Sequence, residues 1–399
     1  MRYLAQLIAE IIPEVQALRR ELHRYPEPAF EEVETAERVV AHLKDIAGVD
    51  VRTGVAGTGV VATIGVERDG PCIALRADMD CLRIQEKNGF AHASSRPNLM
   101  HACGHDGHTA ALVGAALVLG QMQEGLAGPV KCIFQPAEES RGGARVMIED
   151  GVLESPTVSA IFGLHGSTSL SLDTIALRSG PVMAASRYFS ITIHGRGGHA
   201  ASPHLGIDPV LIGSQIICLA QSIVARNVPP VSPALIAIPK FVGSTAANVI
   251  PETVTLEGTL RALANDTRQL LEERLRELVE QTAAALGGSA EISYYGGYPL
   301  LENDVDAVDT VRAAAGRFLA SHQVDMGYPP SMEAEDFAFY LQHVPGAFFW
   351  LGMQDREATR FPLHHPRFDF NDEVLATAIR LHCEIAISHG HRHSSGEES

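Results

Sequence analysis

The sequence predicts an α/β protein in which a mixed sheet flanked by helices is interrupted by an inserted, ferredoxin-like α+β unit. Three observations lead to this fold class. Strand-like runs alternate with helical periodicity in the first part of the chain, the order β-α-β-β-α-β occupies the middle, and the last hundred residues are poor material for an independent core. The C-terminal part is therefore expected to complete the first domain.

The first part of the chain begins with two helices. Helical periodicity runs through Leu4–Leu22, where Pro13 is expected to break the helix, and through Glu31–Ile46. The elements that follow are predicted in the order strand, strand, helix, strand, helix, strand, at Gly59–Val66, Cys72–Arg76, Thr109–Met122, Val130–Phe134, Ala144–Glu149 and Ala160–Leu164.

The middle of the chain has its own rhythm of four strands and two helices. These elements are predicted at Tyr188–His194, Asp208–Ala225, Ala234–Phe241, Thr253–Arg261, Thr267–Leu286 and Ala290–Tyr295. Beyond them, helices at Asp304–Leu319 and Asp372–Ile387 enclose a strand at Ala347–Leu351. We therefore predict a discontinuous domain of residues 1–184 and 298–399 and an inserted domain of residues 185–297.

The composition restricts the classes of function. The chain of 399 residues is long enough for two domains, and its formal net charge of −17 disfavours binding to nucleic acid or to an anionic membrane surface. We expect no transmembrane span and no signal peptide from the pattern of apolar and charged residues. The six scattered cysteines fit a reducing compartment, so a cytoplasmic protein is expected.

The densest group of metal-binding side chains lies in the segment M-H-A-C-G-H-D-G-H, residues 100–108. Cys103 and His105 are two residues apart in an extended stretch, so their side chains point to the same side, as two ligands of one centre must. The helix predicted from Thr109 directs its positive N-terminal dipole at them and favours anionic ligands. An isolated C-x-H is more often a histidine-rich surface loop, but four candidate donors at the start of a helix favour a metal site.

Two further candidates follow strands of the same predicted sheet. Glu138 and Glu139, in Q-P-A-E-E, follow the strand Val130–Phe134, and His165 follows Ala160–Leu164. Ligands of open α/β sheets gather at the carboxyl ends of the strands. One glutamate can therefore ligate a metal while its neighbour acts as general base toward a metal-bound water. The alternative is that the glutamates are solvated charges and the histidine is structural.

The last candidate is the pair His364-His365, which precedes Pro366. With one of these histidines, the donors Cys103, His105, Glu139 and His165 would become a set of five. Five protein ligands are too many for one catalytic, tetrahedral zinc with an open position, but they suit two metal ions that share a bridging ligand and a water.

These residues resemble the dinuclear metallo-amidohydrolases, a branch of the zinc aminoacylase and carboxypeptidase superfamily. The branch holds hippurate hydrolase, bacterial N-acyl-amino-acid deacylases and plant indole-acetyl-amino-acid hydrolases. The motifs that carry the resemblance span nearly the whole chain: L-H-R-Y-P-E, H-A-C-G-H-D-G-H, Q-P-A-E-E, G-L-H, G-R-G-G-H-A-A, A-A-N-V-I-P-E, G-T-L-R, E-D-F and L-H-x-P-x-F-D-F-N-D.

The resemblance implies roles for particular residues. The metal ligands would be Cys103, His105, Glu139, His165 and His364, with Glu138 as the general base. The family usually has Leu-His, then Ser or Asn, then Pro, which selects His364, but the departure at His365 leaves that choice open. Asp78 would orient one of the metal ligands without binding the metal itself, or else it would cap a helix or turn.

The resemblance also implies that the inserted domain is a lid and a dimerisation domain, so a homodimer or higher homo-oligomer is expected. His199 would reach a catalytic cleft, often that of the partner subunit, and help to stabilise an oxyanion. Asn248 and Arg261 would hold the carboxylate of the substrate. Their alternatives are a turn residue and an exposed strand charge. The stretch Gly166–Ser169 departs from the family and is expected to line the acyl pocket.

The predicted reaction is hydrolysis of the amide bond of an N-acyl amino acid to a carboxylic acid and a free amino acid. Two divalent ions, zinc or else manganese, cobalt or nickel, would activate a water whose proton Glu138 accepts. Three alternatives stay open. They are a dipeptidase or carboxypeptidase, a cysteine hydrolase with Cys103 as nucleophile and His105 as base, and a metal-binding protein without turnover.

Overall fold

The structure is a computed structural model that describes residues 2–244, 246–355 and 361–394. Two compact units make up the chain. The first combines the chain up to Gly180 with Glu302–Tyr328 and the chain from Phe339 onward, and the second combines Pro181–Leu301 with Pro329–Ala338. The predicted boundaries differ at this last segment. It belongs with the second unit because the Ala184 amide donates to the Ser331 carbonyl at 3.1 Å.

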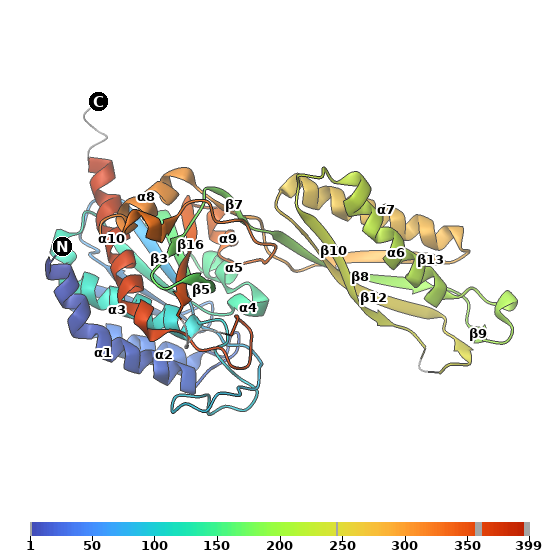
Figure 1. Cartoon of the computed structure of the whole chain (residues 1–399), viewed down its shortest axis with the longest axis horizontal. Helices are drawn as coiled ribbons and strands as arrows, with labels where there is room; N and C mark the ends of the chain where they lie inside the picture. Colours follow the sequence, from blue (N-terminus) through green and yellow to red (C-terminus); the bar gives the residue numbers. More distant parts are fainter. Residues whose placement is uncertain (1, 245, 356–360, 395–399) are drawn as a thin grey trace. The chain divides into compact units, whose positions relative to one another are not determined.

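The first unit is built on a mixed eight-stranded sheet in the order β1-β2-β4-β3-β5-β16-β6-β15, of which Figure 1 labels β3, β5 and β16. Its strands are β1 (Val49–Val55), β2 (Gly59–Ile64), β3 (Cys72–Asp78), β4 (Val130–Gln135), β5 (Val158–Ser171), β6 (Ile175–Ala176), β15 (Val324–Asp325) and β16 (Gly346–Gln354). The central strands β4, β3, β5 and β16 are parallel to one another. β3 and β4 are buried along their whole length, as expected for parallel strands covered on both faces.

The helices of this unit are α1 (Arg2–Arg24), α2 (Val33–Leu43), α3 (His105–Gln121), α4 (Glu138–Arg141), α5 (Gly143–Glu149), α8 (Val305–Ala315), α9 (Ala338–Leu341, which begins at the last residue of the second unit) and α10 (Leu375–Ser394). α3 packs against both α1 and α10, and all three share one hydrophobic core with the sheet. Gly114 permits this close packing, since a Cβ there would lie 2.7 Å from Ile379 and 3.0 Å from Val15.

The second unit consists of β8 (Ala185–His194), α6 (Pro209–Asn227), β10 (Ala234–Val242), β12 (Thr253–Ala262), α7 (Asn265–Ala285) and β13 (Ser289–Tyr295). The strands form an antiparallel sheet in the order β10-β12-β8-β13 (Figure 1), the order of a ferredoxin-like unit. Side chains of α6 and α7 join those of the sheet in a second core. The predicted fold class, a mixed sheet with an inserted ferredoxin-like unit, is confirmed.

α6 is the one described helix that is long and apolar enough to cross a membrane by length and composition. The core helix of a globular unit passes the same test. Ile212, Ile216 and Ile223 of α6 are buried in the core of the second unit. The apolar character of α6 therefore has a structural use in the ferredoxin-like unit.

Four details of the sequence-based elements are corrected by the structure. α1 continues through Pro13, whose ring lies on the exposed side of the helix, where water can satisfy the carbonyl that loses its partner. α3 begins at His105 and not at Thr109, and β5 continues to Ser171, so His165 lies inside a strand. β1 was not predicted, because as the edge strand it is largely exposed and lacks an apolar run.

The stability of the first unit is expected to depend on one buried histidine of α10. His382 is 1% exposed, and its Nδ1 has no hydrogen-bond partner among the described residues. Burial lowers the pKa of His382 to about 3. The neutral ring therefore stabilises the folded state above pH 6.5, and this contribution is lost as the pH falls from 6.5 toward 3.

Replacing His382→Leu should flatten this acid response. Between pH 7 and pH 4.5, the free energy of unfolding in urea should fall less for the variant than for the parent, by on the order of 2 kcal/mol. The exposed His322→Leu is the matched control. Loss of metal at acid pH affects all three proteins, so the difference between them is the readout. Parallel pH curves for the parent and His382→Leu would contradict the prediction.

Candidate metal centre

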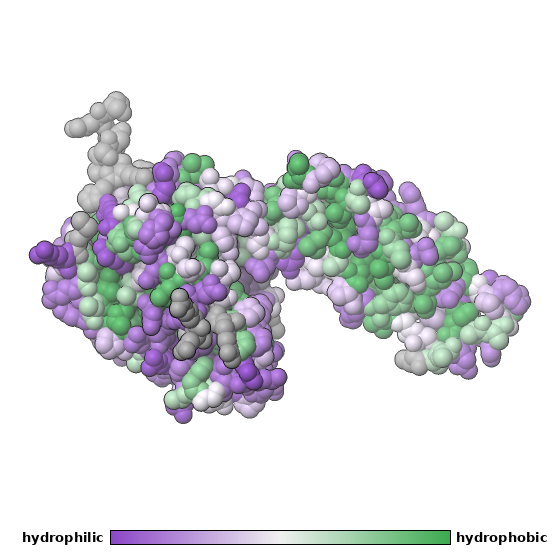
Figure 2. Space-filling model, viewed as in Figure 1, coloured by the Kyte–Doolittle hydropathy of each residue, from purple (hydrophilic) through white to green (hydrophobic). Residues whose placement is uncertain are grey.

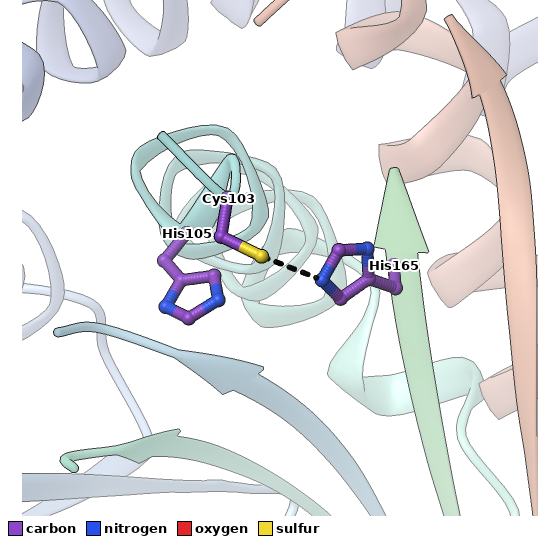
Figure 3. A group of neighbouring side chains, drawn as sticks. All are labelled: Cys103, His105 and His165. Carbon is purple, nitrogen blue, oxygen red and sulfur yellow. Dashed lines mark hydrogen bonds between the residues drawn. The ribbon is translucent and has the colours of Figure 1, made fainter. Parts of the chain in front are cut away.

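The start of α3 brings a thiol and two imidazoles together. Gly104 has φ +90°, which places Cys103 and His105 on either side of a left-handed residue before the first helical turn. The Cys103 Sγ lies 3.4 Å from the His165 Nε2 of β5 (Figure 3). One donor atom from each of Cys103, His105 and His165 lies within 4.8 Å of the others, and all three residues are buried.

The two glutamates follow β4 through a left-handed turn. Ala137 has φ +58°, and Glu138 and Glu139 begin α4. The carboxylate of Asp80 accepts from both of their amides, at 3.0 Å for Glu138 and 3.1 Å for Glu139. His105, Glu138 and Glu139 offer donor atoms within 4.8 Å of one another. Asp80 therefore fixes the backbone from which both glutamates extend.

His364 arrives from a segment 199 positions further along the chain than His165, and it also has a left-handed backbone, with φ +64°. Its amide donates to the Ala102 carbonyl at 2.7 Å, which pins it beside the Cys103 loop. Its Nε2 lies 3.4 Å from Glu139 Oε1, and Cys103, Glu139 and His364 form another group of close donors. His365 turns away and stacks on Phe361 at 4.6 Å. The structure thus brings His364, and not His365, to the cluster.

The donors fit a cation. The His105 Nδ1 donates to the Asp80 carbonyl at 2.9 Å, which leaves its buried Nε2 with no hydrogen-bond partner among the described residues. Glu139 Oε1 is also buried and makes no hydrogen bond among the described residues, although the His364 Nε2 lies 3.4 Å away. Two orphaned polar atoms that face each other at 3.9 Å are costly unless a ligand satisfies them. A metal ion between them would do so.

The charges around these donors also favour a cation. Burial lowers the pKa of His105, but the charges of Asp78, Asp80 and Glu139 raise it to about 10. Burial and the same kind of negative neighbours raise the pKa of the Cys103 thiol well above its usual value. Such a field holds a proton on both groups when nothing else is bound, and a divalent cation would displace both protons. A thiol in this field is poorly suited to act as a free nucleophile.

Asp78 is hydrogen-bonded to His108, which is not one of the predicted metal ligands. Its Oδ1 accepts from the His108 Nδ1 at 2.7 Å, and its Oδ2 accepts from Arg76 at 2.6 Å. The His108 Nε2 in turn accepts from the Gly166 amide at 2.8 Å. Asp78 thus acts through His108 on the backbone next to His165, while it lies 3.8 Å from the His105 Nε2.

Sequence reasoning missed Asp80 and His108. Asp80 lies two residues after Asp78, and His108 ends the motif H-A-C-G-H-D-G-H, but each contacts backbone amides that are far away in the chain. The available signal for Asp80 is its position just after β3, at the sheet edge where the other candidates gather.

The remaining predicted site residues, His199, Asn248 and Arg261, belong to the second unit. β9 (Gly198–His199) pairs with β11 (Val249–Ile250), and the Ala200 amide donates to the Asn248 carbonyl at 3.1 Å, so His199 and Asn248 are neighbours. The exposed His199 accepts from the Ala201 amide through Nδ1 at 3.0 Å. A neutral ring in this state carries its proton on Nε2 and can donate from there. Arg261 donates to the Met332 carbonyl at 2.8 Å.

The chain is similar to known proteins over most of its length. Residues 74–388 match the model of peptidase family M20/M25/M40. The chain is 42% identical to N-acetyl-L-cysteine deacetylase of Bacillus subtilis over 90% of its own length and 84% of the relative. It is 40% identical to IAA-amino acid hydrolase ILR1-like 4 of Arabidopsis thaliana over 92% of its length and 84% of that protein.

A solved structure also resembles the chain over nearly its full length. It is a dinuclear metal-binding peptidase of family M20 from Bacillus subtilis, which aligns with a TM-score of 0.82 and 36% identity over 95% of this chain and 98% of that one. The predicted family, and with it the predictions of a metal-dependent hydrolase and of amide-bond hydrolysis, are confirmed. The chain belongs to peptidase family M20/M25/M40.

Proposed function

We propose that this protein uses two divalent metal ions to hydrolyse the amide bond of N-acyl amino acids. The observation that carries the proposal is the convergence of five donor side chains, from four separate segments of the first unit, on one place beside Glu138, where Cys103, His105 and His165 are buried and His364 is exposed. The donors are Cys103, His105, Glu139, His165 and His364. A structural cluster would not need the orphaned His105 Nε2 and Glu139 Oε1.

The donors divide into two groups that share one member. Cys103, His105 and His165 form one group of close donor atoms, and Cys103, Glu139 and His364 form the other. The first group would hold one ion and the second group the other, with Cys103 common to both. The ions would supply a Lewis acid that polarises the amide carbonyl and lowers the pKa of the attacking water. Thiolate, imidazole and carboxylate together suit zinc best, with manganese, cobalt or nickel as the other candidates.

The residues of the chain then divide the remaining work. Glu138 would accept the proton of the attacking water and deliver it to the departing amine. We assign this role to Glu138 because Asp80 holds its backbone amide and because neither group of metal donors includes it. The Nε2 of His199, the proton-carrying nitrogen of its neutral ring, would donate to the oxyanion. Asn248 and Arg261 would hold the substrate carboxylate, and Asp78 would steady the His165 strand through His108.

The inserted domain, predicted as residues 185–297 and extended in the structure to Pro181–Leu301 with Pro329–Ala338, is proposed as a lid and dimerisation domain, and the predicted domain of residues 1–184 and 298–399 as the catalytic one. Exposed apolar side chains support a partner surface on the inserted domain: Leu211 and Leu219 of α6, and Phe241 and Val242 of the edge strand β10. Figure 2 shows hydrophobic surface along this unit. We propose a homodimer formed through this surface, in the cytoplasm, where the six cysteines, all free in the structure, stay reduced.

The substrate class is tested with the purified protein. It should be stripped with a chelator, reloaded separately with zinc, manganese, cobalt or nickel, and assayed for amine release. The panel should hold N-acetyl amino acids, hippurate, an indole-acetyl amino acid and dipeptides with free N-termini. We expect turnover of acylated amino acids that is lost on chelation and restored by metal, with about two ions bound per chain.

The alternatives make different predictions in the same assay. Preference for the dipeptides would identify a peptidase. Turnover that survives chelation but is lost on mild alkylation of the metal-loaded protein would identify Cys103 as a nucleophile. Bound metal without turnover on any substrate would sink the proposal.

A further inference from the structure

We propose that Glu32 is a positioning residue for the general base Glu138, and that it acts through the backbone amide of Ala137. The inference rests on the proposed function, because it assigns a task to a residue of that same site. Glu32 lies immediately before α2, more than a hundred positions away from the turn that it contacts, and no sequence motif of the metal centre includes it.

The contact is direct and buried. Glu32 is 0% exposed, and its Oε1 accepts from the Ala137 amide at 2.9 Å. Its Oε2 accepts from the Thr58 hydroxyl at 2.6 Å, so both oxygens of the carboxyl group are fixed. Asp80 holds the next two amides, those of Glu138 and Glu139. Two carboxylates therefore bind three successive amides of one turn.

The turn needs this support because of its backbone. Ala137 has φ +58°, a left-handed conformation that an alanine rarely adopts unless its surroundings hold it there. The other end of the turn is closely packed, since a Cβ on Gly143 would lie 1.7 Å from the Pro136 carbonyl oxygen. Without the acceptor at Glu32, the Ala137 amide would be a buried donor with no partner, and rotation of this peptide is the nearest relief.

The direction in which the Glu138 side chain leaves the turn depends on that peptide. Asp80 alone fixes the amides of Glu138 and Glu139, but it does not fix the peptide that precedes them. A general base must lie within hydrogen-bond reach of the proton that it accepts, so a small rotation at Ala137 should reduce the rate more than it reduces substrate binding.

The chemistry of the Glu32 carboxyl group indicates which variant should preserve its task. Burial raises the pKa of Glu32 to about 7, and the charge of Asp80 also raises it, against the lowering effect of its hydrogen bonds to Thr58 and Ala137. A full negative charge is therefore not required near neutral pH. Glutamine keeps an oxygen acceptor for the Ala137 amide and a polar group for the Thr58 hydroxyl, whereas leucine keeps only the volume.

The test compares Glu32→Gln, Glu32→Leu and Thr58→Val in the full-length, zinc-loaded protein. Glu31→Leu is the matched control, because Glu31 is the exposed neighbour and pairs with the exposed Arg83 at 3.5 Å. The readouts are kcat, KM and metal content on one N-acetyl amino acid. We expect Glu32→Leu to lower kcat about 100-fold at saturating zinc while KM changes about threefold or less.

Rescue by the conservative variant separates positioning from a general structural role. The kcat of Glu32→Gln should stay within about fivefold of the parent. Thr58→Val removes only the hydrogen bond to Oε2, so its kcat should lie between those of Glu32→Gln and Glu32→Leu. If Glu32→Leu does not fold, the order of parent, glutamine variant and Thr58→Val still tests the inference. Glu31→Leu should behave as the parent.

Several results would overturn the inference. One is an unchanged kcat in Glu32→Leu or, if that variant does not fold, in Thr58→Val. The others are an equal loss of kcat in the leucine and glutamine variants, and a loss of kcat that follows zinc content alone. Failure of the proposed function would look different. The metal-loaded parent protein would then turn over no acylated amino acid, and neither the role of Glu138 as general base nor its positioning by Glu32 would stand.

Discussion

Glu138→Gln is expected to lower kcat by about 10²- to 10⁴-fold, the range that general acid–base catalysis contributes. Glutamine has the same size but cannot take a proton from water. The backbone amide of Glu138, and not its side chain, holds the turn at Asp80, so the neighbouring Glu139 should keep its place. Zinc content should therefore be normal, and KM should change little.

Glu139→Gln is the matched control for this variant. It alters the adjacent carboxylate, whose Oε1 lies 3.4 Å from the His364 Nε2, and it should lower the metal content together with the rate. Metal analysis and initial rates on the same preparations separate the two. Near-native turnover by Glu138→Gln at full metal content would show that another group accepts the proton.

Arg19→Met is expected to lower the free energy of unfolding by about 3 kcal/mol. Arg19 in α1 is fully buried and forms ion pairs with Asp106 at 3.0 Å, with Asp369, and with Asp372 at 3.4 Å. Methionine fills the volume but leaves Asp106 buried with less compensation. His23 still contacts Asp106 at 2.8 Å, which places the expected cost at the low end of the range for a broken buried pair.

Arg20→Met provides the comparison, because Arg20 is half exposed and pairs only with Asp372, at 2.8 Å, among the described contacts. Exposed ion pairs contribute about 1 kcal/mol or less to stability, so the urea concentration at the unfolding midpoint should be nearly the same for Arg20→Met as for the parent. Both variants should be measured with zinc bound. If Arg19→Met proved as stable as Arg20→Met, the buried network would not be a net support of the fold.

The sequence predicts the helices and strands well where apolar periodicity is strong. β3, β4 and the six elements of the ferredoxin-like unit lie within a few residues of their predicted ranges, because each buries one face or both. The edge strand β1 and the two-residue strands β9 and β11 were missed, because pairing alone defines them. Tertiary packing also kept α1 continuous, against the local preference of Pro13.

The candidate site could be predicted as far as its donors lie in local motifs. Cys103, His105 and Glu139 have neighbours that mark them, and the structure brings all three together. The choice between His364 and His365 required the backbone, since one left-handed residue decides which ring faces Cys103. Asp80 and Glu32 act on amides that any residue possesses, so their partners leave no trace in the sequence.

The position of β16 beside β5 imposes an order on the folding of this enzyme during its synthesis. Four of the five donors leave the ribosome before residue 166, whereas His364 and the strand that completes the sheet beside His165 follow roughly two hundred residues later. At about 5–20 residues per second, this interval is on the order of 10–40 s. During this interval the ferredoxin-like unit is synthesised, while β5 still lacks its neighbour β16 on one side. A nascent chain therefore holds an incomplete set of the proposed donors for most of its synthesis, and the proposed second ion would be retained only after His364 has been made.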